Sequence, residues 1–180
     1  MKYSHITEGK FLSRPNRVIG YVDIGGITEK VHVKNTGRCK ELLTGQAVVY
    51  LEKSSNGKRA TAYDLVAVKK GERMINMDSY APNRAVGEWL WKKELFPTLR
   101  GVWAEKTYEK SRFDFYVETG RTDFPGGKRG DAGAGNAAYF PDAPSERAVK
   151  HVEELVKAKK EGYGAYLVFV VQMQGVDFFS

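Results

Sequence analysis

Short apolar runs that alternate with polar residues, separated by glycine-rich turns, dominate the chain from Lys10 to Asp78. Alternation with a period of two indicates strands, and a Gly-Gly pair or a sequence such as SSNG between two runs indicates a hairpin. The predicted strands are residues 17–24, 27–33, 46–53, 60–69 and 73–77, with a short helix at residues 39–43. Five short strands and one small helix in this length predict a small closed β-barrel of the OB type.

The pattern changes after residue 80, where apolar residues recur at helical spacing. Pro82 is well placed in a first helical turn, and the spacing continues to Phe96. Two alternating runs follow and predict strands at residues 101–107 and 113–118. The second half therefore begins with a helix and a pair of strands.

Two further elements are expected near the C-terminus. A helix is predicted at residues 143–161, capped by Asp142, and one of its faces is expected to be buried through an apolar stripe of Val149, Val152, Leu155 and Val156. The nearly continuous apolar run at residues 166–173 is typical of a strand buried on both faces of a mixed or parallel sheet. Residues 120–138 contain six glycines and no apolar period, so they are expected to form a loop.

Positive charge is concentrated in the first of two predicted domains. The chain holds 29 Lys and Arg against 22 Asp and Glu, a net charge of +7. The OB-like domain, residues 1–80, holds 14 against 8, whereas the α/β domain, residues 81–180, holds 15 against 14. A basic domain beside a nearly neutral one predicts that the first binds a polyanion and that the second keeps its carboxylates for another task. Solubility is the alternative, because such a charge is ordinary for a small domain.

Composition excludes several other classes of protein. The longest strongly apolar run, residues 165–171, is far shorter than the roughly 20 residues of a membrane helix, and the first residues lack the apolar core of a signal peptide. We therefore expect a cytoplasmic protein with no membrane partner. The single cysteine, Cys39, has no partner for an internal disulfide or a zinc site and is expected to be a small half-buried residue. The oligomeric state is left open, a homo-oligomer included.

A carboxylate lies between two aromatic residues on the predicted strand at 113–118. Because Asp is disfavoured inside strands, three interpretations of Asp114 stay open: it binds a divalent cation, pairs with Arg112, or lies on the solvent face of an edge strand. Glu105 on the preceding strand could supply a second carboxylate, and two oxygen ligands completed by waters are a set that Mg²⁺ accepts in phosphodiester chemistry. His32 alternates outward on its strand and is expected at the surface.

Candidate nucleic-acid contacts lie around the turn Asn35-Thr36-Gly37-Arg38, between a strand and the short predicted helix. An arginine beside free backbone amides is suited to a phosphate, and a helix cap with a solvated arginine is the alternative. Arg14 and Arg17 add two guanidinium groups near the start of the first long strand. If DNA is bound, contacts to the backbone and to unstacked bases are expected through Arg14, Arg17, Asn35, Arg38 and the aromatic Tyr21.

The chain resembles the sugar fermentation stimulation protein A (SfsA) family between Gly9 and Phe179 in six ordered strings: FLSRPNRVIGYVDI, VHVKNTGRCKELL, INMDSYAPNR, SRFDFYVE, YFPDAPSERAVKHVEEL and YLVFVVQM. The resemblance implies an N-terminal OB-like barrel and a C-terminal α/β domain similar to the PD-(D/E)xK (restriction-endonuclease-like) nucleases. It also implies nucleic-acid binding and a regulatory effect on sugar use. Within that domain it implies that Asp114 is the first metal carboxylate, with Glu105 as an accessory.

The sequence departs from the family pattern directly after the Asp114 strand. The family has a second strand there that carries Glu-x-Lys in a string like FVEVKGVTL, whereas residues 124–133 read FPGGKRGDAG. Lys128 can take the Lys position, but Gly126 stands where the Glu belongs. A nuclease of this class needs the Glu to complete its metal site and the Lys to stabilise charge on the phosphate. The resemblance also implies a further helix and strand beyond Ser180.

A compensated local frameshift would account for this departure. The codons CCT GGA GGT AAA AGG GGT GAC GCT GGA GCA encode Pro125 to Ala134 and, followed by GG, read one base later as LEVKGVTLEQ. That sequence is the strand that the family pattern requires. We therefore hypothesise that a shifted reading frame, restored near Tyr139, replaced the strand. A gene sequence whose codons do not permit this second frame would refute the hypothesis.

These observations support a DNA-binding protein of the SfsA type, a regulator of sugar (maltose) metabolism, that keeps its nuclease-like domain as a scaffold. Whether the DNA is single-stranded or double-stranded is left open. The missing Glu predicts that the domain is inactive as an enzyme. The first alternative is a Mg²⁺-dependent nuclease acting through Asp114, Glu105 and Lys128. The second is a protein-interaction or small-ligand module, because OB barrels bind many ligands.

Overall fold

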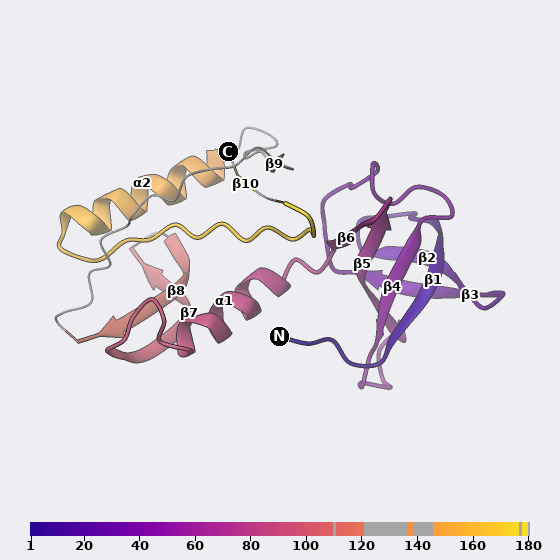
Figure 1. The fold of residues 1–180 in the computed structure, drawn as a ribbon, viewed down its shortest axis with the longest axis horizontal. Coiled ribbons are helices and arrows are strands. Elements are labelled where there is room, and N and C mark those ends of the chain that lie inside the picture. Colours follow the sequence, from indigo (N-terminus) through magenta and orange to yellow (C-terminus); the bar gives the residue numbers. More distant parts are fainter. Residues whose placement is uncertain (110, 121–136, 139–145, 177, 180) are drawn as a thin grey trace. The chain divides into compact units, whose positions relative to one another are not determined.

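The computed structural model describes residues 1–109, 111–120, 137–138, 146–176 and 178–179 (Figure 1). The chain divides into two compact units. The first comprises Met1–Pro82 with Gln172–Gly175, and the second comprises Asn83–Val171 with Val176–Ser180. No helix in the described ranges is both long and apolar enough to cross a membrane.

The first unit is a closed β-barrel with an OB-type arrangement of strands. Its strands are β1 (Ile6–Ser13), β2 (Ile19–Ile24), β3 (Ile27–Val33), β4 (Val48–Lys53), β5 (Tyr63–Lys70) and β6 (Arg73–Asn76). Their order in the sheet is β3-β2-β1-β4-β5-β6, and β3 also pairs in parallel with β5, which closes the barrel. The predicted OB-like fold is confirmed, as are the hairpin β2–β3 and the pairing of β4 with β5.

Glycines allow the turn and the close strand packing in this barrel. Gly25 and Gly26 join β2 to β3 with φ angles of 61° and 89°, a left-handed region that glycine enters at little cost. Gly9 lets β1 cross β2 closely, because an added Cβ atom would lie 2.5 Å from Val22 Cγ1. The interior is filled by alternate apolar residues of the strands, chiefly Val22, Val31, Val33, Val49, Leu51, Leu65, Val68 and Met77.

Two predictions for this unit were wrong. The strand β1 was missed, and it supplies the fifth strand of the closed barrel, whereas β6, predicted at residues 73–77, is an extra strand at the edge of β5. The helix predicted at residues 39–43 is a single turn, in which the amides of Leu42 and Leu43 both donate to the carbonyl oxygen of Cys39. Cys39 has a φ angle of 46°, which a right-handed helix does not allow. Its side chain is half-buried, as expected.

The second unit is the predicted α/β part. It contains β7 (Leu99–Tyr108), β8 (Ser111–Thr119), β9 (Ala137–Ala138), α2 (Glu146–Lys160) and β10 (Phe178–Phe179), and α1 (Ala81–Trp91) leads into it from the barrel. The strands β7 and β8 form an antiparallel hairpin, and β9 pairs in parallel with β10. Helix α1 ends at Trp91, earlier than predicted. Lys93, just beyond it, has a φ angle of 62°, which a right-handed helix does not allow.

One face of the β7–β8 hairpin packs against α1 and the segment after it. Phe115 and Val117 of β8 pack against a small core formed by Leu90, Phe96 and Leu99. Because side chains alternate along a strand, the residues between them point to the opposite face. That face is exposed to solvent and carries Arg112, Asp114, Tyr116 and Glu118.

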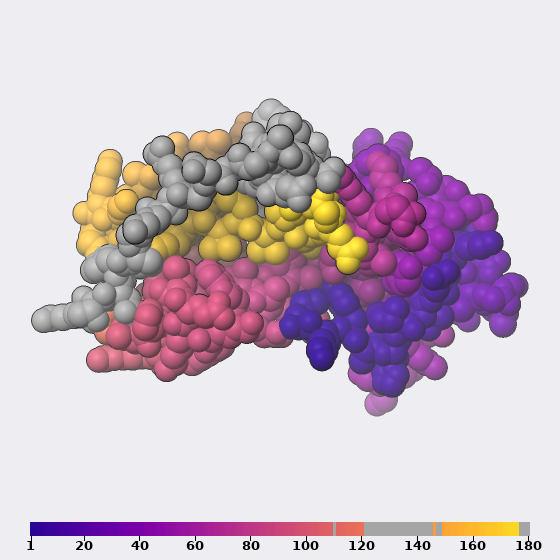
Figure 2. All heavy atoms as spheres, in the orientation of Figure 1, coloured from indigo at the N-terminus to yellow at the C-terminus, as the bar shows by residue number. Residues whose placement is uncertain are grey.

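The C-terminal elements differ from the prediction in their burial. Residues 166–173 form no strand; Leu167 is 58% exposed, and Met173 forms an isolated bridge with Ile75 of β6. The yellow atoms of this segment are visible at the surface in Figure 2. The stripe of α2 is exposed at Val149, Val152 and Val156 rather than buried. The physical reason is that no strand in the described part of the chain pairs with residues 166–171.

Several predicted features lie outside the described residues. They include the helix cap Asp142, residues 121–136 of the predicted loop, and Lys128. The described part of α2 begins at Glu146.

Candidate functional site

The guanidinium group of Arg14 joins two segments of the barrel that are distant in sequence. Its Nη1 donates to the carbonyl oxygens of Gly37 at 2.8 Å and Arg38 at 3.0 Å. Its Nη2 donates to the carbonyl oxygens of Arg17 and Asn35, both at 2.5 Å. A guanidinium whose terminal nitrogens all serve backbone carbonyls is not available for a phosphate. Arg14 therefore positions this corner of the barrel, which we call the arginine corner, instead of meeting a ligand directly.

The arginine corner presents two free side chains. Arg17 and Arg38 are both exposed, and their backbones are held by the same guanidinium group. The Asn35 side chain accepts a hydrogen bond from the Gly37 amide at 2.8 Å, so it holds the turn and does not cap a helix. Tyr21 on the neighbouring strand β2 is exposed too. The structure thus brings together Arg17 and Arg38 on a rigid support, which sequence reasoning could not establish.

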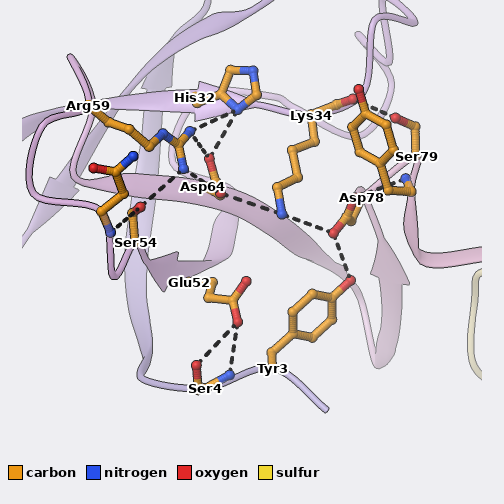
Figure 3. A network of polar contacts seen from close by, with 12 residues as sticks. Tyr3, Ser4, His32, Lys34, Glu52, Ser54, Arg59, Asp64, Asp78 and Ser79 are labelled. Carbon is orange, nitrogen blue, oxygen red and sulfur yellow. Dashed lines mark hydrogen bonds and ion pairs between the residues drawn. The ribbon is translucent and has the colours of Figure 1, made fainter. Parts of the chain in front are cut away.

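A network of charged side chains lies along the parallel seam between β3 and β5 (Figure 3). Asp64 accepts hydrogen bonds from Arg59 at 2.6 and 3.0 Å and lies 3.0 Å from Nδ1 of His32. Nζ of Lys34 is 3.4 Å from Asp64 and 3.1 Å from Asp78. His32 alternates outward as predicted, since Val31 and Val33 on either side of it are buried, but its partly exposed side chain contacts Asp64, which was not predicted.

The network keeps the Asp64 carboxylate ionised. Burial opposes the charge of Asp64, but hydrogen bonds from Arg59 and His32 and the charge of Lys34 outweigh it and lower the pKa to about 2. Burial also opposes the charge of Lys34, yet Asp78 and Asp64 raise its pKa above the ordinary value. Since each acid here has a cationic partner, we interpret the network as structural and not as a ligand site. Sequence reasoning missed it because its members come from separate strands.

The carboxylates Asp114 and Glu105 lie on the exposed face of the β7–β8 hairpin. Asp114 accepts a hydrogen bond from Nδ2 of Asn83 on α1 at 3.2 Å. Arg112 does not pair with Asp114; its Nη1 lies 3.5 Å from Oε2 of Glu105. Glu105 and Asp114 both lie between the paired positions Ala104–Phe115 and Lys106–Phe113, and Glu105 has a φ angle of 54°, so β7 is irregular at this point. Like charges at opposite positions of a sheet destabilise it, and a bound cation would relieve that cost.

The donor set for a cation is small in the described ranges. They contain no group of three or more His, Cys, Asp or Glu residues able to hold a metal ion. Two carboxylates completed by waters fit Mg²⁺, which usually keeps several waters, better than they fit Ca²⁺, which takes six to eight oxygen ligands. Lys128, the third predicted catalytic residue, lies outside the described residues.

Comparisons with known proteins agree with the fold of both units. Residues 12–77 match the family description "SfsA N-terminal OB domain", and residues 80–180 match "Sugar fermentation stimulation protein RE domain". A sugar fermentation stimulation protein homolog of Ruminiclostridium cellulolyticum is 53% identical over 99% of this chain and 80% of its own length. One from Desulfitobacterium hafniense is 49% identical over 100% of this chain and 79% of its own length.

A solved structure shares this architecture. The SfsA protein of Pyrococcus furiosus, determined in complex with Ca²⁺, has a TM-score of 0.78 and 28% sequence identity, and the match covers 100% of this chain and 78% of that chain. The chain thus spans about four fifths of the length of these relatives.

Proposed function

The chain belongs to the sugar fermentation stimulation protein family, and from this we propose that it is a DNA-binding member whose OB-like domain holds the nucleic acid. The arginine corner carries the proposal, because it presents two exposed guanidinium groups with their backbones already fixed. A preorganised pair of cations loses little conformational freedom when it meets two phosphates. A regulatory effect on sugar (maltose) metabolism would follow from such binding, and a role on DNA fits the cytoplasmic location that the sequence predicts.

The charge of the whole barrel surface supports the same partner. Asp64 and Asp78, two of the domain's acidic residues, are buried against cations. The exposed basic residues of the barrel outnumber the exposed acidic ones; they are Lys2, Lys10, Arg17, Lys30, Arg38, Lys40, Lys53, Lys58, Arg59, Lys69 and Lys70. Such an excess attracts a polyanion and gives binding that weakens with salt.

Replacing Arg17 and Arg38 together by Ala is expected to weaken DNA binding and to reduce the slope of log K against log salt by about 1.4 to 1.8, because each lost phosphate contact removes about 0.7 to 0.9. Fluorescence anisotropy with labelled single-stranded and double-stranded DNA across a salt series measures both quantities. The matched control is Lys69→Ala with Lys70→Ala, which removes the same charge at the exposed end of β5. If the two double variants lose the same DNA affinity and the same salt slope, then net charge and not the arginine corner is responsible for DNA binding.

A second function is favoured by the opposed carboxylates: binding of a divalent cation by Asp114 and Glu105. Mg²⁺ bound there could stabilise charge on a phosphodiester, which is the task of the metal in PD-(D/E)xK nucleases. The sequence lacks the Glu of the Glu-x-Lys pair, so we expect cation binding without efficient DNA cleavage. The Ca²⁺ complex of the Pyrococcus furiosus relative supports a divalent cation in this family.

Mg²⁺ or Ca²⁺ is expected to raise the melting temperature of the wild-type protein but not that of Asp114→Asn. At a concentration about 100 times the Kd, the gain in unfolding free energy is about 2.7 kcal/mol. Without cations, Asp114→Asn should be at least as stable as the wild type, because it removes the repulsion from Glu105. Glu118→Gln, on the same face of β8, is the control and should keep the response. A cation response in Asp114→Asn as large as in the wild type would refute this site.

A further inference from the structure

Two large aromatic side chains lie next to each other on the exposed face of the β7–β8 hairpin. Trp103 and Tyr116 are cross-strand partners with ring centroids 5.5 Å apart and an angle of 45° between the rings. They are 44% and 40% exposed. Nζ of Lys106 lies 6.0 Å from the centre of the Tyr116 ring. Two adjacent rings, inclined to each other and with an ammonium group beside them, form an aromatic, cationic surface.

Packing within the hairpin explains only part of this arrangement. The Trp103 ring lies against the backbone of Gly101, because a Cβ atom added there would be 2.2 Å from Cη2 of the ring. This contact covers the glycine and fixes the orientation of the indole. Tyr116 has no such glycine beneath it: the position opposite Gly101 is Glu118. The exposed Tyr116 ring therefore needs another explanation.

We propose that Trp103, Tyr116 and Lys106 form a stacking platform for an unpaired base of single-stranded DNA. Aromatic rings combined with cations are the usual means of binding unpaired bases, since every base has a π-face and the adjacent phosphates are negative. In a duplex those faces are already stacked on neighbouring bases. This inference rests on the proposed DNA-binding function and extends it to the second unit.

Lys106 is the charged group on this face that favours a nucleic acid, because its ammonium group lies beside the Tyr116 ring. Glu105 is paired with Arg112, and Asp114 is hydrogen-bonded to Asn83. Lys106 has no acidic partner among the described residues. Asp114 and Tyr116 are two residues apart on the same face of β8, a separation of about 6.6 to 6.8 Å along a strand. With a divalent cation bound at the carboxylate pair, as proposed above, the phosphate next to a base stacked on Tyr116 would lie beside that cation.

The test is binding of a labelled oligo(dT) strand and of a DNA duplex to the full chain across a salt series without divalent cations. Tyr116→Leu is expected to lose roughly 5- to 150-fold in affinity for oligo(dT), whereas Tyr116→Phe keeps most of it. The salt slope should not change, because no phosphate contact is removed. Trp91→Leu, which removes an exposed indole from α1, is the matched control and should bind as the wild type does.

The outcomes separate this inference from the proposed function. If wild-type protein binds neither oligo(dT) nor duplex, the DNA-binding function fails and the platform fails with it. If wild-type protein binds oligo(dT) with a steep salt dependence and Tyr116→Leu binds equally well, only the platform is refuted. The platform is also refuted if Tyr116→Leu loses as much affinity for the duplex as it loses for oligo(dT). Circular dichroism and thermal melting confirm that the Tyr116 variants are folded, and Trp103→Leu is compared only if it melts like them.

Discussion

Replacing Lys34 by Met is expected to lower the free energy of unfolding of the barrel by about 3–5 kcal/mol. The side chains involved are almost inaccessible: Lys34 is 16% exposed, and those of Asp64 and Asp78 are 8% and 0% exposed. Lys34 is the cation that both carboxylates share. Without it, Asp78 keeps only the Tyr80 amide and the Tyr3 hydroxyl as hydrogen-bond donors. A buried carboxylate without its counter-charge is among the most destabilising changes available in a protein core.

Urea unfolding followed by circular dichroism measures this effect. Lys30→Met is the matched control, because Lys30 lies on β3, the strand that Lys34 directly follows, and its side chain is exposed. It should change the unfolding free energy by less than about 0.5 kcal/mol. Adding Asp78→Asn to Lys34→Met should recover part of the loss, since the second change removes one of the unpaired charges. If Lys34→Met is as stable as Lys30→Met, the network does not stabilise the seam.

The network matters for function because of where Lys34 lies in the chain. It directly follows β3 and directly precedes the turn that carries Arg38. The hydroxyl of Ser79 also donates to the Lys34 carbonyl at 2.7 Å. The end of β3 is therefore anchored by charge on one side and by Arg14 on the other. We infer that loosening the seam would also disturb the arginine corner.

The barrel was largely predictable, because alternation with a period of two depends on local burial. Five of its strands and the Gly25-Gly26 turn follow from that pattern. Strand β1 was missed since only Phe11 and Gly9 are buried in it and its other positions are exposed or half-buried. The roles of Arg14 and His32 could not be predicted, because their partners lie on segments that only the folded barrel brings near.

Burial in the second unit was the least predictable property. The apolar stripe of α2 and the run at residues 166–171 have the composition of buried elements, and yet both are exposed. Composition shows that a segment is able to be buried, whereas burial itself requires a neighbouring element to cover it. In the family pattern, that neighbour would be the Glu-x-Lys strand, whose place this chain fills with FPGGKRGDAG. We infer that this one altered stretch accounts for both failed predictions.

Replacing residues 125–134 by LEVKGVTLEQ is therefore expected to stabilise the second unit strongly. The new sequence alternates apolar and polar residues and supplies a strand beside which residues 166–171 can pair. Each large apolar side chain that becomes buried contributes about 1.5–3 kcal/mol. Urea unfolding, the binding of a hydrophobic dye and amide hydrogen exchange at residues 166–171 measure the change. The dye should bind less and the amides should exchange more slowly.

Two further variants separate the effect of the insert on stability from its effect on Mg²⁺ binding. A scrambled version of the same insert keeps its composition but loses the alternation, so it should not stabilise the unit. The insert with its first Glu changed to Gln should match the repaired chain in stability. It should bind Mg²⁺ more weakly, because the restored Glu adds a third carboxylate to Asp114 and Glu105. If the repaired chain is no more stable than the original, then the exposure of α2 and of residues 166–171 has a cause other than a missing strand.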